Sequence, residues 1–139
     1  MPRRRKAREC ALQLLFQWEG DRLDPDTLLP GFWKGRKEDA YTRRFAEELF
    51  RGTVASLQET DALIATHSQH WKLERMAAVD RNLLRLAAYE LQARSDTAPA
   101  VIIDEALEIA RRFSSENSVE FINGVLDAIR KTLAARVKS

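Results

Sequence analysis

The chain has 139 residues, of which 45% are hydrophobic, and this size and content suit one domain spanning 1–139 with a real core and exclude a disordered polymer. Five glycines and four prolines are few, and helix-forming residues dominate, which indicates an all-α fold rather than a sandwich or barrel. No stretch reaches the roughly 18 to 20 continuous apolar residues that a membrane span needs, so we expect no membrane association.

Basic residues are concentrated at the N-terminus. Residues 1–8 hold Arg3, Arg4, Arg5, Lys6 and Arg8 and no acid, whereas the rest of the chain has 18 basic and 21 acidic residues. A local positive field on a mildly acidic body suits a polyanion such as RNA, because cations that neutralise phosphates release counterions. On charge alone, a solvated basic tail is an equal alternative.

The first predicted helix runs from Arg4 to Glu19, and Gly20 supplies a stop. Six residues at helical spacing form its apolar stripe: Ala7, Cys10, Ala11, Leu14, Leu15 and Trp18. Leu12 and Phe16 project to the opposite side, so Phe16 is either an exposed binding residue or a contact for a second internal layer. Cys10 is the only cysteine, and we expect a buried, inert thiol in a reducing compartment.

The middle of the chain alternates between irregular and helical patterns. Residues 21–37 hold two prolines and two glycines and predict a connection with a short helix near Pro25 to Leu29. A long helix with two apolar faces is predicted from about Glu38 to Thr66. Residues 67–75 follow as a turn, in which we expect Trp71 and Leu73 to point inward.

Three further helical segments complete the pattern. Residues 77–93 are apolar around much of their circumference, which predicts a deeply buried helix. Pro99 suits the first turn of the next helix. Asn117 and Glu120 resemble a capping box that starts the last helix, and Phe121 lies off its apolar stripe. Gly124 inside this helix suggests a close approach of another helix.

A search for catalytic chemistry finds no recognisable motif, so we expect no catalytic residues and no cofactor. His67 and His70 share one side of a turn, but zinc needs about four ligands, and we expect no metal site. The acids Asp104, Glu105 and Glu108 are best explained as solvated charge pairs with nearby arginines.

Three segments together resemble the NusB family, and they occur in that family's order over nearly the whole chain: RRKARECALQLLFQWE, VDRNLLRLAAYEL and VIIDEALEIARRFSSENSVEFINGVLDAI. The resemblance implies an all-α bundle of two stacked three-helix subdomains in a bacterial cytoplasmic protein that is not an enzyme. It also implies binding of the boxA element in ribosomal RNA leader transcripts, with NusE, a small-subunit ribosomal protein, in an RNA polymerase antitermination complex.

The resemblance assigns roles to particular residues. Those expected to contact RNA are Arg3, Arg4, Arg5, Lys6, Arg8, Asn117, Ser118 and Phe121. Those expected to contact the protein partner are Phe16, Trp18, Asp80 and Arg81. The arginine-rich start and Phe121 should together form a cradle for the transcript, with phosphates on the cations and a base on the ring. For Asn117 and Ser118, simple helix capping is an equal alternative.

Two other functions fit parts of the sequence. NusB-like domains occur fused ahead of a ribosomal RNA methyltransferase, but no catalytic domain is expected here because the sequence ends at Ser139. A helical protein-interaction module without RNA-binding activity would use the arginines only for solubility. The sequence leaves the choice between a monomer and a homodimer open.

Overall fold

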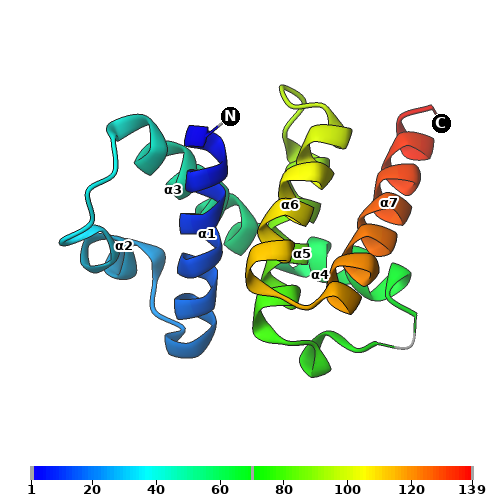
Figure 1. The fold of residues 1–139 in the computed structure, drawn as a ribbon, viewed down its shortest axis with the longest axis horizontal. Coiled ribbons are helices and arrows are strands. Elements are labelled where there is room, and N and C mark those ends of the chain that lie inside the picture. Colours follow the sequence, from blue (N-terminus) through cyan, green and yellow to red (C-terminus); the bar gives the residue numbers. More distant parts are fainter. Residues whose placement is uncertain (1, 70, 139) are drawn as a thin grey trace.

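The computed structural model describes residues 2–69 and 71–138, and these residues form an all-α fold, as the sequence predicts (Figure 1). A first group of helices comprises α1 (Pro2–Asp21), α2 (Pro25–Trp33) and α3 (Ala40–Ala55). A second group comprises α4 (Leu57–His67), the 3₁₀ helix η1 (Leu73–Arg75), α5 (Ala78–Ala93), α6 (Pro99–Phe113) and α7 (Glu116–Lys138). Figure 1 shows the two groups side by side, with α1 facing α6 across the boundary.

The helix α1 packs against both groups. It contacts α2 and α3 on one side and α5 and α6 on the other. Leu12 is therefore buried, with 6% of its surface exposed, and the prediction that it points away from the core is wrong. Phe16 does lie off the core, because 56% of its surface is exposed. Cys10 is buried, as predicted.

The predicted long helix over residues 38–66 is wrong, because the chain bends at Ser56 and divides it into α3 and α4. The two parts pack differently, since α3 lies on α1 and α5 whereas α4 lies on α5 and α7. One turn before this bend, Gly52 lies against the ring of Tyr89 on α5. A Cβ atom added at Gly52 would overlap this ring. The two apolar faces that the sequence shows in this segment therefore belong to two separate helices, α3 and α4.

Smaller differences concern helix ends and loops. Asp24 accepts a hydrogen bond from the Asp26 backbone N–H and Pro25 occupies the first turn, so α2 starts as predicted but extends to Trp33. Trp71 is 56% exposed, so its predicted inward orientation is wrong, whereas Leu73 does pack on the core. Nothing lies within 4 Å of a Cβ atom added at Gly124, so the predicted close approach there is also wrong.

The buried apolar side chains of the two groups form one continuous cluster. It includes Leu14 and Leu15 of α1, Phe50 of α3 and Leu126 of α7. In the described part of the chain, no helix is both long and apolar enough to cross a membrane. The two groups of helices therefore share a core, and the surfaces around it carry the candidate sites.

Candidate nucleic-acid and partner interfaces

The basic residues at the start of the chain lie on the first turns of α1, where carboxylates from three other segments surround them. Four ion pairs result: Arg3 Nε to Asp39 Oδ2 at 3.4 Å, Arg4 Nη2 to Asp96 Oδ2 at 3.5 Å, Arg5 Nη2 to Glu105 Oε2 at 2.5 Å, and Lys6 Nζ to Glu38 Oε2 at 3.7 Å. The strong local positive field expected from the sequence is therefore largely compensated in the folded chain.

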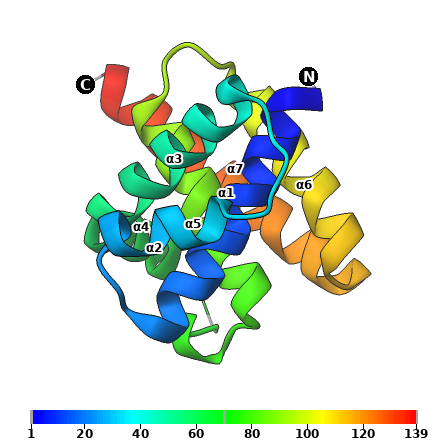
Figure 2. The same cartoon turned by 90° about the vertical axis from the view of Figure 1, so that its left-hand side faces the viewer.

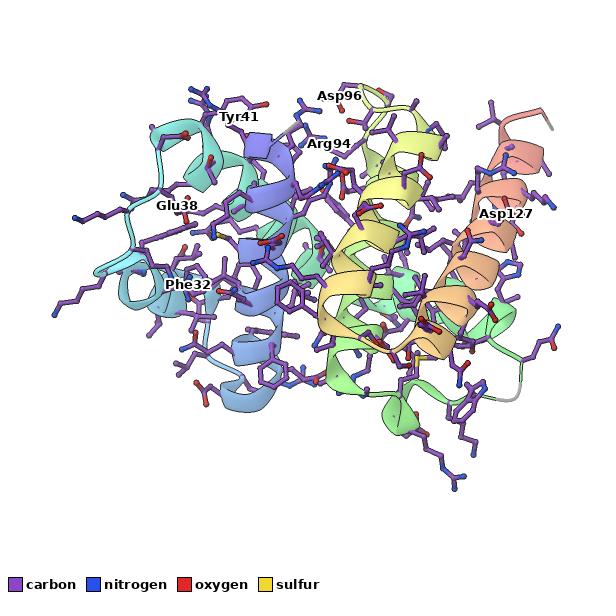
Figure 3. All side chains as sticks on the ribbon, viewed as in Figure 1. Phe32, Glu38, Tyr41, Arg94, Asp96 and Asp127 are labelled. Carbon is purple, nitrogen blue, oxygen red and sulfur yellow. The ribbon has the colours of Figure 1, made fainter. Side chains whose placement is uncertain are left out.

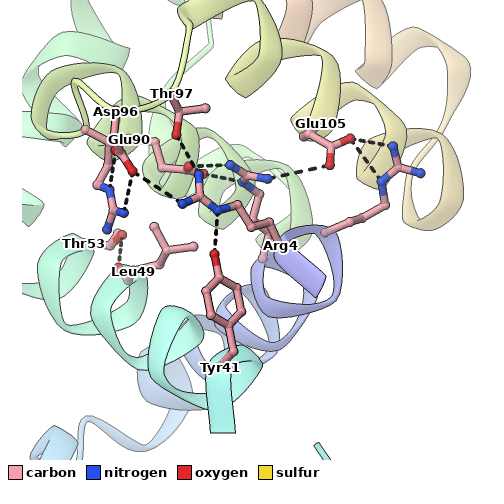
Figure 4. A network of polar contacts seen from close by, with 11 residues as sticks. Arg4, Tyr41, Leu49, Thr53, Glu90, Asp96, Thr97 and Glu105 are labelled. Carbon is pink, nitrogen blue, oxygen red and sulfur yellow. Dashed lines mark hydrogen bonds and ion pairs between the residues drawn. The ribbon is translucent and has the colours of Figure 1, made fainter. Parts of the chain in front are cut away.

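Arg4 is half-buried and bonds to residues of several other segments. Its Nε donates to the Tyr41 hydroxyl at 3.0 Å and its Nη1 donates to the Thr97 hydroxyl at 3.1 Å (Figure 4). The bond to Tyr41 raises the pKa of Arg4. Figure 3 shows Tyr41 on one side of the start of α1, and Arg94 and Asp96 on the other. Arg4 thus bridges the two groups of helices.

Arg8 is a structural residue, and its predicted contact with RNA is wrong. Its side chain is only 3% exposed, and its Nε and Nη2 donate to the two carboxylate oxygens of Glu90, each at 2.9 Å. Glu105 approaches from α6, with Oε1 3.6 Å from Arg8 Nη1, which is too long for a hydrogen bond. A phosphate has no access to this guanidinium, because both groups of helices cover it.

A groove of about 390 Å³ lies at the start of α7. Its lining includes Trp71, Arg75, Asn117, Ser118 and Phe121. The half-buried ring of Phe121 meets the exposed ring of Trp71 edge to face, with 6.4 Å between the ring centroids. An aromatic pair beside a guanidinium can stack on an unpaired base and attract its phosphate.

Two of the groove residues were not predicted from the sequence. Trp71 was expected in the core and Arg75 had no assigned role, although both are exposed. The local composition could have indicated this site. Trp71 lies within four positions of Lys72 and Arg75 in an irregular segment, and such a combination is typical of a surface that binds nucleic acid.

Asp80 organises the start of α7 and is buried, with 7% of its surface exposed. Its carboxylate accepts hydrogen bonds from the Ser114 hydroxyl at 2.5 Å and the Ser118 hydroxyl at 2.8 Å. Ser115, rather than Asn117, caps the helix by accepting from the Ser118 backbone N–H at 3.1 Å. The predicted capping box is therefore wrong, and Asn117 remains exposed in the groove.

Arg81 is also engaged within the chain. Its guanidinium pairs with Glu19 of α1 at 2.5 Å and donates to the backbone carbonyls of Leu73 and Met76. Asp80 and Arg81, expected at a partner surface, thus both hold helices together. Trp18 is buried, as its place on the apolar stripe predicts, and the Arg22 guanidinium lies 4.5 Å from its ring centre. These three side chains offer little surface to a partner.

A second groove, of about 360 Å³, runs along α1 beside Phe16. Its walls include Leu12 and Phe32 from the first group of helices and Val79 and Phe113 from the second. Phe113 is 45% exposed and Phe16 is 56% exposed, so the groove presents two aromatic rings to solvent. Such an apolar groove between two helical groups suits a protein partner.

The beginning of α1 lies near the top of Figure 1 and Figure 2, whereas α7 begins in the lower half of both views. The two views share the vertical axis, so the separation is real. The arginine cluster does not line the groove that contains Phe121, so a joint cradle for the transcript stays a prediction.

The remaining candidates from the sequence concern metal ligands. His67 shares a hydrogen bond of 2.9 Å between its Nε2 and the Thr132 hydroxyl. His70 lies outside the described residues. Within residues 2–69 and 71–138, no group of three or more histidine, cysteine, aspartate or glutamate side chains is arranged to hold a metal ion.

Fold and surface together define an all-α binding protein with one groove between the two helical groups and another within the second group. The family model that matches residues 5–131 is the NusB family. A transcription antitermination protein NusB from Solibacter usitatus is 47% identical over 135 residues, which cover 96% of this chain and 92% of the relative. The chain belongs to the NusB family.

Solved structures agree with this assignment. A Thermotoga structure described as T. maritima NusB has 40% identity and a TM-score of 0.82, and the match covers 92% of this chain and 90% of that one. A crystal structure of the antitermination factors NusB and NusE in complex with double-stranded RNA has 26% identity and a TM-score of 0.85, with 95% of this chain and 98% of that one covered.

Proposed function

We propose that the chain is a transcription antitermination factor that binds boxA-type RNA of ribosomal RNA leader transcripts together with a NusE-type ribosomal protein. The observation that carries the proposal is the groove at the start of α7, where Phe121 and Trp71 lie beside Arg75. Relatives of this chain are named as antitermination proteins, and one related structure contains NusE and RNA. Action within an RNA polymerase antitermination complex, in the cytoplasm, is part of the proposal.

In this proposal the groove reads the bases. Unpaired bases stack on the rings of Phe121 and Trp71, because sequence-specific RNA readers use aromatic side chains in this way. The exposed amide of Asn117 offers hydrogen bonds to a base edge without repelling phosphates. The hydroxyl of Ser118 already donates to Asp80, so Ser118 contributes mainly by shaping the groove.

The exposed cations at the start of α1 contact the RNA backbone away from the groove. Arg3, Arg5 and Lys6 have side chains between 45% and 64% exposed. A phosphate that reaches Arg3 replaces the exposed carboxylate of Asp39, and exposed ion pairs of this kind are worth only about 0 to 1 kcal/mol. This exchange is therefore inexpensive, and it makes binding salt-dependent. The carboxylate partner of Arg5, Glu105, is buried, so Arg5 contributes to the field without leaving its partner.

The proposed protein partner occupies the groove beside Phe16. A NusE-type protein would cover the exposed rings of Phe16 and Phe113 with its own apolar side chains. Phe16→Ala is expected to weaken the complex by about 2 kcal/mol or more if the ring is a central anchor, as measured by isothermal titration. Self-association through the same groove would instead appear in sedimentation as a homodimer that Phe16→Ala dissociates.

The RNA proposal is tested with Phe121→Ala and a 12-nucleotide boxA RNA. We expect a loss of about 1 to 3 kcal/mol in binding free energy, because one base loses its stacking partner. Phe113→Ala is the matched control, since it removes an exposed ring from the other groove. If Phe121→Ala only lowers thermal stability and the folded fraction binds RNA as before, the chain is instead a protein-interaction module or binds RNA elsewhere.

A further inference from the structure

The outer side of α3 and the linker before it carry cations that the sequence analysis did not single out. Residues 34–51 contain Lys34, Lys37, Arg43 and Arg44, all exposed. Figure 2 shows α2, this linker and α3 on the side of the molecule that faces the viewer. A groove of about 410 Å³ on this side is lined by Arg43, Arg44 and Arg51 together with Glu47 and Glu48.

The acidic residues of the same segment are already bonded to other groups. Glu38 pairs with Lys6 and Asp39 pairs with Arg3, both on α1. Glu47 accepts a hydrogen bond from the indole N–H of Trp33 at 2.7 Å. Glu48 accepts from Arg94 Nη1 at 3.2 Å. Glu38, Asp39 and Glu48 thus pair with cations of other segments, whereas the bond from the neutral indole leaves the charge of Glu47 uncompensated.

The basic residues are left without such partners. Lys34, Lys37 and Arg44 make no ion pair with any residue that the structure describes. Arg43 lies over the ring of Trp33, with 5.3 Å between its Cζ and the ring centre, which holds the guanidinium at the surface without neutralising it. Carboxylates thus compensate the cations at the start of α1, whereas the cations of this surface have no described carboxylate partner.

We propose that Lys34, Lys37, Arg43 and Arg44 form a sequence-independent contact surface for the phosphate backbone of RNA, separate from the groove at the start of α7. An array of exposed, unpaired cations binds phosphates by releasing counterions and reads no base. The proposal rests on the proposed function only in taking RNA as the polyanion. It gives the flanking, non-boxA part of a transcript a place on the protein.

The test uses the full chain, a 30-nucleotide oligouridylate and fluorescence anisotropy over a range of salt concentrations. Lys37→Gln with Arg44→Gln removes two cations that have no described ion pair. We expect the affinity for oligouridylate to fall about five-fold near 0.1 M salt, and the slope of log affinity against log salt to decrease by about 1.4, for two lost phosphate contacts. Lys131→Gln with Arg136→Gln on α7 is the control, with equal charge loss.

The outcomes separate this surface from the RNA site of the proposed function. The proposal predicts that the control changes oligouridylate affinity less than two-fold, and that Lys37→Gln with Arg44→Gln leaves binding of the 12-nucleotide boxA RNA unchanged. Equal losses in both double variants, or no measurable oligouridylate binding by the wild type at low salt, overturn it. If Phe121→Ala has no effect on boxA RNA but oligouridylate binding still depends on Lys37 and Arg44, the proposed boxA site in the groove is refuted and the proposed phosphate-binding surface is supported.

Discussion

The buried ion pair between Arg8 and Glu90 allows a quantitative prediction about stability. Glu90→Gln keeps the size of the side chain but leaves the Arg8 guanidinium charged and 3% exposed, with only the Glu105 carboxylate nearby at 3.6 Å. Breaking a buried pair costs about 3 to 5 kcal/mol, and the remaining carboxylate places this variant near about 3 kcal/mol. This is a large part of the roughly 5 to 15 kcal/mol that stabilises an ordinary domain.

Urea unfolding followed by circular dichroism measures the effect. With a urea dependence of about 1.5 kcal/mol per molar, the midpoint should fall by about 2 M. Glu108→Gln is the control, because Glu108 pairs with Arg111 at 2.6 Å on the exposed side of α6 and should cost under about 0.5 kcal/mol. Arg8→Met combined with Glu90→Leu should recover most of the loss. A cost below about 1 kcal/mol for Glu90→Gln would refute the reasoning.

Two further predictions concern the packing of α3 and the loss of folding stability at low pH. Gly52→Ala should destabilise the protein by about 1 to 3 kcal/mol, since its methyl group overlaps the Tyr89 ring, and Gly52→Ala with Tyr89→Ala should recover part of the loss in thermal unfolding. A hydrogen bond from Arg81 lowers the pKa of Glu19, so its stabilising contribution is present above the ordinary glutamate pKa of about 4.3 and disappears as the pH falls below it. The stability difference between pH 7 and pH 3 should therefore be smaller in Glu19→Gln, and an unchanged difference would exclude this pair as a cause of acid destabilisation.

Helical periodicity accounts for most of what the sequence predicted correctly. The apolar stripe of α1, the buried α5 and the first-turn proline of α6 are local properties, because each depends on residues within a few turns of one another. The break at Ser56 is not local. It depends on α4 packing against α5 and α7, and a sequence with two apolar faces does not distinguish one helix from two.

The candidate sites were harder to predict than the fold, because charges were visible but their partners were not. Arg8 and Glu90 are 82 residues apart, and Arg5 and Glu105 are 100 apart, so no pattern within α1 reveals which arginines are neutralised. Helical position placed Phe16 off the apolar stripe without deciding its exposure, since Leu12 on the same side is buried, and exposure of Trp71 depends on an irregular segment without periodicity.

Burial of Cys10 gives the protein an internal reporter. The thiol is 1% exposed on the side of α1 that faces the core, and burial raises its pKa, so the reactive thiolate is scarce in the folded state. Since the sequence has no other cysteine, a thiol-specific reagent added in excess labels each molecule once, and only after α1 has separated from its neighbours. The labelling rate under native conditions thus measures how often α1 separates from the segments that cover Cys10, without any engineered probe.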